Sequence, residues 1–184
     1  MSKIDPSEKR PFIPVGIAVM TVSDTRTLAD DRSGDTLVKR ITEAGHHLKD
    51  RAIVTDDIEK IQAQMKQWID DESVDVIIST GGTGLTGRDV TPDAARPLFE
   101  KEIDGFGVMF QKISYDKIGL SAIQSRALGG VAGGTYIFCL PGSTGACKDG
   151  WDGILEKQLD YRTLPCNFVE IMPRLDEHLQ RKKD

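Results

Sequence analysis

The chain has 184 residues, of which 39% are hydrophobic, and this length suggests one domain with enough apolar residues for a core. Its formal net charge of −5, with no basic block beyond Arg181–Lys183, argues against nucleic acid as a main partner. No apolar run reaches the roughly 18 residues of a membrane span, and the polar N-terminus lacks the apolar stretch of a secretory signal. We therefore expect a cytoplasmic protein that has no contact with membranes.

Strand and helix patterns alternate from the first apolar run onward. Val15–Val22 is a continuous apolar segment rich in β-branched residues, which predicts a strand buried on both faces. Helical spacing over Leu37–Ala44 predicts a helix, and Gly45 marks its end. Lys49–Val54 predicts a second strand, and Ile58–Ile69 a second helix with one apolar face.

The second half of the chain continues the alternation. Val74–Ser79 predicts a third buried strand, and Thr91 is placed to cap the helix that follows. The stripe over Phe106–Ile113 predicts a helix whose apolar face belongs to the core or to a subunit interface. Thr135–Leu140 predicts a late strand, followed by a helix that carries Trp151–Leu159.

This alternation predicts an α/β fold, a three-layer sandwich with a mostly parallel central sheet and helices on both faces. We interpret residues 1–11 as a flexible N-terminal arm, 12–175 as the domain and 176–184 as a polar C-terminal tail. Ligands of such folds bind at the carboxyl ends of the strands, near a switch in strand order. The loops after the first, third and last predicted strands hold the residues with the most chemistry.

Cysteine and histidine give no sign of a metal centre or disulfide framework. Cys139, Cys147 and Cys166 match no zinc spacing, and three is an odd number. His46 and His47 lie at a predicted helix end, where imidazoles suit the helix dipole. No permanently bound cofactor is expected from these residues.

The glycine-rich segment Gly81–Ala94 is the strongest functional signal. Glycines allow positive φ angles, and consecutive exposed N–H groups can form a cradle for an anion. Arg88 and Asp89 add a cation and a carboxylate just before the next helix. The combination suits a phosphate with bound Mg²⁺, although a plain surface turn stays open as an alternative.

Two common phosphate motifs do not explain this segment. Gly82–Gly87 formally matches G-x-G-x-x-G, but a Rossmann loop leads directly into its helix and has an acidic residue about 20 positions later at a strand end. Here Pro92 delays the helix, and no strand pattern precedes Glu102. The Gly-Lys-Ser/Thr of a Walker A loop is absent. Dinucleotide binding and P-loop phosphoryl transfer are therefore not expected.

The run from Gly81 to Ala94 resembles the signature of the MoaB/MogA family of molybdenum cofactor biosynthesis proteins. The resemblance extends from about Phe12 to Phe168, and within the family the MoaB members are the most similar. Other segments agree with the family pattern, namely Thr21–Asp24, Asp56–Asp57, Ser125–Arg126 and Leu140–Ser143.

The resemblance implies that this protein binds molybdopterin and adenylylates it with Mg-ATP, releasing pyrophosphate, before a MoeA-type partner inserts molybdate. Asp56 and Asp89 match the family's important aspartates and are the implied catalytic residues, with Asp89 also the implied Mg²⁺ ligand. The implied substrate- and phosphate-binding residues are Ser23, Asp24, Gly81, Gly82, Thr83, Gly84, Arg88, Thr91, Ser125, Arg126, Pro141, Gly142 and Ser143.

Several alternatives remain at the level of sequence. Thr55 stands where the family often has proline, whereas Arg88 and Asp89, which some MoaB proteins lack, are present and favour retained activity. The second hypothesis is a non-catalytic molybdopterin-binding or scaffold protein, redundant with MogA. Asp56 and Ser143 could instead be simple helix caps. The family also implies a homo-oligomer, either a trimer or a hexamer.

Overall fold

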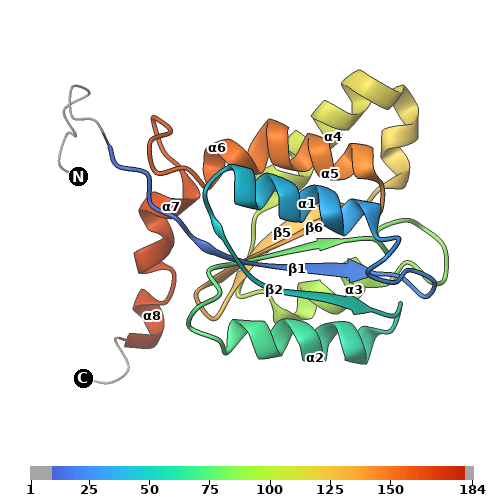
Figure 1. The fold of residues 1–184 in the computed structure, drawn as a ribbon, viewed down its shortest axis with the longest axis horizontal. Coiled ribbons are helices and arrows are strands. Elements are labelled where there is room, and N and C mark those ends of the chain that lie inside the picture. The colour runs from blue at the N-terminus through green and yellow to red at the C-terminus, as the bar shows by residue number, and fades with distance from the viewer. Residues whose placement is uncertain (1–9, 181–184) are drawn as a thin grey trace.

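The computed structural model describes residues 10–180 and shows one sheet between two layers of helices (Figure 1). The sheet has the strand order β2-β1-β3-β6-β5-β4. Parallel pairing joins the first four strands in this order, whereas β5 is antiparallel to both β6 and β4. The strands are β1 (Gly16–Val22), β2 (His47–Val54), β3 (Val76–Thr80), β4 (Lys101–Glu102), β5 (Leu128–Ala132) and β6 (Thr135–Leu140). The predicted α/β sandwich with a mostly parallel sheet is confirmed.

Helices cover both faces of the sheet. On one face lie α1 (Arg32–Glu43), α4 (Asp104–Ile118) and α5 (Thr144–Gly150), which continues through a π-helical turn, η3 (Trp151–Leu155), into α6 (Glu156–Gln158). On the other face lie α2 (Ile58–Ile69), α3 (Thr91–Ala95) and the short 3₁₀ turn η1 (Arg96–Leu98). The central strands are therefore buried on both sides, which is why their sequences are continuous apolar runs rather than alternating ones.

Alternate residues of β1 pack into two separate hydrophobic cores, one on each face of the sheet. Ile17 and Val19 pack in the cluster with α1 and α5, whereas Ala18 and Met20 pack in the cluster with α2 and α3. All four side chains are fully buried. This alternation follows from the period of two along a strand.

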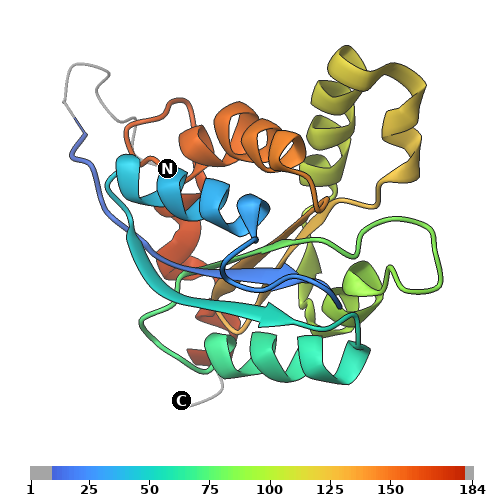
Figure 2. The same ribbon diagram turned by 45° about the vertical axis from the view of Figure 1, so that its right-hand side comes forward.

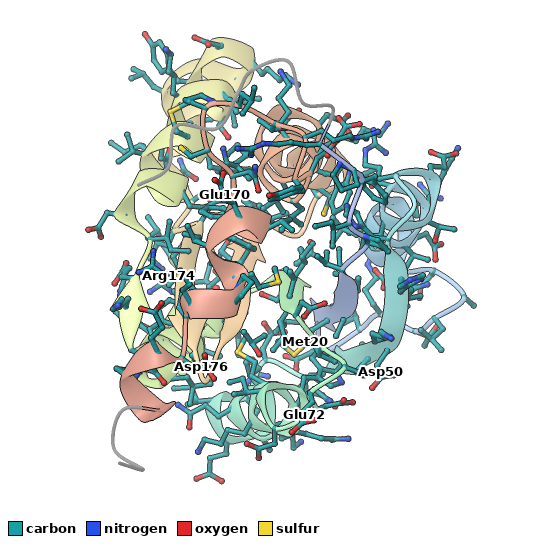
Figure 3. All side chains as sticks on the ribbon, turned by 90° about the vertical axis from the view of Figure 1, so that its left-hand side faces the viewer. Met20, Asp50, Glu72, Glu170, Arg174 and Asp176 are labelled. Carbon is teal, nitrogen blue, oxygen red and sulfur yellow. The ribbon has the colours of Figure 1, made fainter. Side chains whose placement is uncertain are left out.

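The C-terminal segment lies across the amino ends of the strands. It consists of α7 (Phe168–Ile171), η4 (Met172–Arg174) and α8 (Glu177–Gln180), and Figure 3 looks onto this end, where Glu170 and Arg174 are labelled. Arg10 forms an ion pair of 3.0 Å with Glu170. Of the predicted arm and tail, residues 1–9 and 181–184 lie outside the described residues.

Two expectations about local structure are wrong or incomplete. Thr91 does not cap α3, because it is the first residue of the helix and its hydroxyl donates a hydrogen bond to the carbonyl of Gly81 at 2.8 Å. The antiparallel strands β4 and β5, with the 3₁₀ segment η2 (Gly119–Gln124) before β5, were not predicted. Among the described residues no helix is both long and apolar enough to cross a membrane.

The direction in which the chain adds strands to the sheet switches at β1. The chain runs from β1 through α1 to β2 on one side and returns through α2 to β3 on the other side of β1. The loops after β1 and β3 therefore leave the sheet toward opposite faces, which is the switch in strand order where such folds bind ligands.

Candidate functional site

Loops from four neighbouring strands gather at the carboxyl edge of the sheet, and they carry most of the predicted site residues. Ser23 and Asp24 follow β1, Asp56 follows β2, and Gly81–Thr91 spans the loop between β3 and α3. Pro141–Ser143 follows β6. The long loop after β3 extends from the sheet edge toward the segment that joins η2 to β5 (Figure 2). That segment supplies Ser125 and Arg126.

The glycine turn after β3 is held tightly by its neighbours. Gly81 and Gly82 have positive φ angles of 102° and 64°, a region that favours glycine. The Gly81 amide donates to the carbonyl of Leu140 at 3.0 Å, and the Thr91 amide donates to the carbonyl of Gly82 at 2.9 Å. A Cβ on Gly142 would lie 3.1 Å from the Cα of Gly81. The loops after β3 and β6 therefore meet backbone to backbone.

Asp56 lies directly against this turn. A Cβ on Gly82 would lie 3.1 Å from Oδ1 of Asp56, so glycine leaves room for the carboxylate to approach the backbone. The Asp56 amide donates to Oδ1 of Asp24 at 3.1 Å. The cap of α2 is Asp57, which accepts from the Lys60 amide at 3.0 Å. The helix-cap alternative for Asp56 is therefore wrong.

Asp89 closes the far side of the same loop. Its Oδ2 accepts hydrogen bonds from the Thr86 amide at 2.8 Å and the Thr86 hydroxyl at 2.6 Å. A Cβ on Gly84 would lie 2.7 Å from the same oxygen, so the carboxylate packs against the glycine backbone. The Thr86 hydrogen bonds hold the pKa of Asp89 below its usual value, and the carboxylate stays ionised.

Asp24 and Arg88 tie the loops after β1 and β3 together. Nε of Arg88 donates to Oδ2 of Asp24 at 3.0 Å, and the arginine side chain is 67% exposed. The Arg88 guanidinium lowers the pKa of the Asp24 carboxyl. Arg88 is thus a solvent-facing cation at the rim of the glycine turn, which a phosphate can reach.

A cavity of about 500 Å³ opens beside these loops, between α4, η2 and α5. Ser125, Pro141 and Ser143 all line it. The hydroxyl oxygen of Ser125 is buried and has no hydrogen-bond partner among the described residues. A buried polar atom without a partner is costly, so it marks a position where a ligand or water can supply one. Ser143 also caps α5, because its hydroxyl accepts from the Ala146 amide at 3.0 Å.

Two carboxylates of the site lie beside the glycine turn, Asp56 next to Gly82 and Asp89 next to Gly84. Residues 10–180 contain no cluster of three or more His, Cys, Asp or Glu side chains placed to hold a metal ion. Mg²⁺ commonly binds one or two carboxylates and completes its shell with phosphate oxygens and water. Asp56 and Asp89 are carboxylates of the kind that such an ion binds.

Sequence reasoning missed a buried ion pair behind the site. Asp31 is 1% exposed, caps α1 through the Gly34 amide at 2.9 Å, and accepts from Arg51 on β2 at 2.8 Å and from the Thr21 hydroxyl at 2.7 Å. The spacing of Asp31 and Gly34 is an N-cap signal that could have identified the cap. Nothing in the local sequence points to Arg51, because their contact depends on the pairing of β1 with β2.

Residues 18–161 match a family model described as "probable molybdopterin binding domain", which covers well over half of the chain. The chain belongs to this family. The resemblance to the MoaB/MogA proteins, predicted from the glycine segment and the other motifs, is thereby confirmed.

Relatives with solved structures and curated names agree with this family. The chain is 50% identical over 157 residues to molybdenum cofactor biosynthesis protein B of Escherichia coli K12, covering 85% of this chain and 92% of that protein. The protein of the same name from Bacillus subtilis is 44% identical over 149 residues, covering 80% and 87%. A crystal structure of a molybdenum cofactor biosynthesis protein B superposes with a TM-score of 0.82 at 38% identity, covering 91% of this chain and 99% of that one.

Proposed function

We propose that this protein acts in molybdenum cofactor biosynthesis, where it binds molybdopterin and adenylylates it with Mg-ATP, releasing pyrophosphate. The family and the names of the relatives support the pathway. The observation that carries the chemical step is the glycine turn held between Asp56 and Asp89, next to the cavity that Ser125 lines. It combines an anion cradle, two carboxylates and a space for a second substrate.

The reaction needs positioning and charge neutralisation more than covalent chemistry. A terminal phosphate oxygen of molybdopterin attacks the α-phosphorus of ATP, the new P–O bond forms, and the bond to the β-phosphate breaks with its electron pair leaving on pyrophosphate. In our proposal the amides of Gly82 and Thr83 bind phosphate oxygens, because the Gly81 amide is already bound to the carbonyl of Leu140. Arg88 neutralises charge at the rim. Asp89 and Asp56 would hold the Mg²⁺ that enters with ATP, and this ion would supply further charge neutralisation.

The cavity beside the turn is our candidate for the molybdopterin site. Its volume of about 500 Å³ is within the range of small-molecule sites, and its lining combines apolar Phe110 and Pro141 with the hydroxyls of Ser114 and Ser125. The buried oxygen of Ser125 can form the hydrogen bond that it lacks in the described structure with a polar group of the pterin.

The test is direct incubation with molybdopterin, ATP and Mg²⁺, followed by detection of adenylylated pterin and pyrophosphate. We expect Asp89→Asn to lower turnover by about 100-fold or more, because it removes a charge placed for Mg²⁺, while molybdopterin affinity changes little. Asp70→Asn is the matched control, since Asp70 is exposed at the end of α2. Wild-type protein that binds molybdopterin tightly without turnover or ATP dependence would replace this proposal with the non-catalytic binding or scaffold role.

Two partners follow from the proposed role and are proposals with it. The adenylylated product is passed to a MoeA-type protein that inserts molybdate. The chain also forms a homo-oligomer, a trimer or hexamer, through the exposed apolar side chains of α4 and η2.

A further inference from the structure

Arg126 contacts the glycine-rich loop through both its backbone and its side chain. Its amide donates to the carbonyl of Thr83 at 2.9 Å, and Nε donates to the carbonyl of Gly84 at 2.9 Å. One terminal nitrogen donates to the carbonyl of Asp89, and the other donates to both oxygens of Asp93 at 3.0 and 3.1 Å. Every nitrogen of this guanidinium is therefore engaged by protein atoms.

We propose that Arg126 is a positioning residue, a brace that fixes the loop carrying Asp89, and that it does not bind the substrate phosphate itself. Its role for the reaction rests on the proposed function, whereas its role in ordering the loop does not. The family resemblance implied that Arg126 binds the substrate phosphate. Its contacts favour a different role, in which it binds the backbone of the loop around the proposed phosphate site.

The brace spans the part of the loop where geometry matters. Gly84 and Asp89 lie at the two ends of a short segment, and the planar guanidinium of Arg126 donates to the carbonyls of both. No other side chain offers this fork of donors. Between them the Asp89 carboxylate binds back to Thr86. Without the guanidinium, the carbonyls of Gly84 and Asp89 lose their hydrogen-bond donors, and the backbone that positions the Asp89 carboxylate is no longer held in place.

The contacts of Arg88 differ from those of Arg126 in a way that distinguishes a phosphate ligand from a positioning residue. The Arg88 side chain is 67% exposed, and among the described residues its hydrogen bonds go to the side chain of Asp24. The Arg126 side chain is 33% exposed and binds two backbone carbonyls as well as Asp93. A phosphate can reach Arg88 by displacing one exposed carboxylate. At Arg126 it can replace at most the Asp93 carboxylate on one terminal nitrogen, while Nε and the other terminal nitrogen stay bound to the carbonyls of Gly84 and Asp89.

Hydrogen exchange of the ligand-free protein tests the brace without any assumption about activity. We expect Arg126→Ala to raise the exchange rates of the amides in residues 82–90 by about tenfold, since it removes several charge-assisted hydrogen bonds from one loop. Arg96→Ala is the matched control, because it removes an exposed arginine paired with Glu102 and leaves the loop untouched. Unchanged exchange in Arg126→Ala overturns the proposal.

Kinetics test the consequence for the reaction. We expect Arg126→Ala to lower kcat and to raise the Mg²⁺ concentration required for turnover. Added guanidinium ion should partly restore the activity of this variant. Arg126→Lys should be impaired as well, because its single ammonium group cannot reach both carbonyls. A variant that loses molybdopterin affinity while its loop exchange stays at the wild-type rate shows a direct phosphate ligand and overturns the brace. Wild-type protein without turnover refutes the proposed reaction alone, because the exchange result stands independently.

Discussion

Asp56 and Asp89 flank the same glycine turn, yet their surroundings shift their pKa values in opposite directions. Two hydrogen bonds from Thr86 lower the pKa of Asp89. Burial, and after it the nearby carboxylate of Asp24, raises the pKa of Asp56 above its ordinary value. Asp89 is therefore the more constant charge, and Asp56 is the carboxylate whose charge is relieved when a cation enters the site.

His46 gives a prediction for the pH dependence of stability. The residue is 5% exposed, and its Nδ1 accepts a hydrogen bond from the Val15 amide at 3.2 Å, which requires an unprotonated nitrogen. Burial lowers its pKa from the ordinary 6.5. As the pH falls toward and below about 6.5, the unfolded chain therefore binds more protons at this residue than the folded chain, so acid lowers stability.

We expect the free energy of unfolding to fall between pH 7.5 and 5.5, with a slope of at most about 1.4 kcal/mol per pH unit from this one group. Urea unfolding at several pH values measures it. His46→Gln should be less stable at pH 7.5 and show a flatter pH dependence, whereas His47→Gln, at an exposed position, should keep the wild-type slope. Equal slopes in all three proteins would show that His46 is not the group responsible.

The glycine turn after β3 depends on the absence of a side chain at Gly82. Gly82 has φ of 64°, and a Cβ there would lie 2.4 Å from the hydroxyl oxygen of Thr91 and 3.1 Å from Oδ1 of Asp56. Gly82→Ala should therefore cost about 1–3 kcal/mol of stability and displace the Asp56 carboxylate. Gly87→Ala is the control in the same loop, because a Cβ there meets nothing within 4 Å.

Urea unfolding and Mg-ATP-dependent turnover together measure both effects of Gly82→Ala. Stability at the wild-type level would mean that the turn relaxes without strain, and the close approach of Asp56 to Gly82 would then have no structural consequence. The same loss in Gly87→Ala would point to general flexibility of the loop instead of this close contact.

The strands and helices that form the parallel part of the sheet could be predicted because their patterns report burial directly. Val15–Val22 is apolar except for Thr21, because helices cover both faces of β1. β5 could not be predicted, because its central residues are Gly129 and Gly130, which weaken a strand pattern. A Cβ on Gly130 would lie 2.3 Å from the ring of Phe99, so packing by a residue 31 positions away requires the glycine.

Part of the candidate site could likewise be predicted from the sequence, and part of it could not. The residue types of the glycine loop predict an anion site because each of them contributes its own chemistry, whether a free N–H, a cation or a carboxylate. The contacts of Arg126 and Asp31 could not be predicted, since they join residues of different loops and strands. A pattern shows that an arginine is present but not which carbonyl or carboxylate it faces, and that depends on the topology of the sheet.

At the scale of the whole molecule, α4 and η2 stand away from the sheet (Figure 2). Their inner side packs on the core through Phe106 and Phe110. Six large apolar side chains of these two elements are exposed, by 48% to 78%: Val108, Met109, Tyr115, Ile118, Leu120 and Ile123. Apolar residues gathered in this way usually mark an interface, and in a symmetric assembly the same patch is buried on every copy.

We therefore expect purified protein to sediment as a homo-oligomer, and the double variant Leu120→Glu with Ile123→Glu to sediment as a monomer. These side chains are 78% and 77% exposed in the single chain, so the substitutions put charges into the interface without disturbing the core. Ile58→Glu on α2, at 41% exposure, is the control and should keep the wild-type assembly. Sedimentation velocity and circular dichroism measure assembly and fold together. An oligomer of unchanged size in the double variant would place the interface on another surface, and monomeric wild-type protein would refute the assembly altogether.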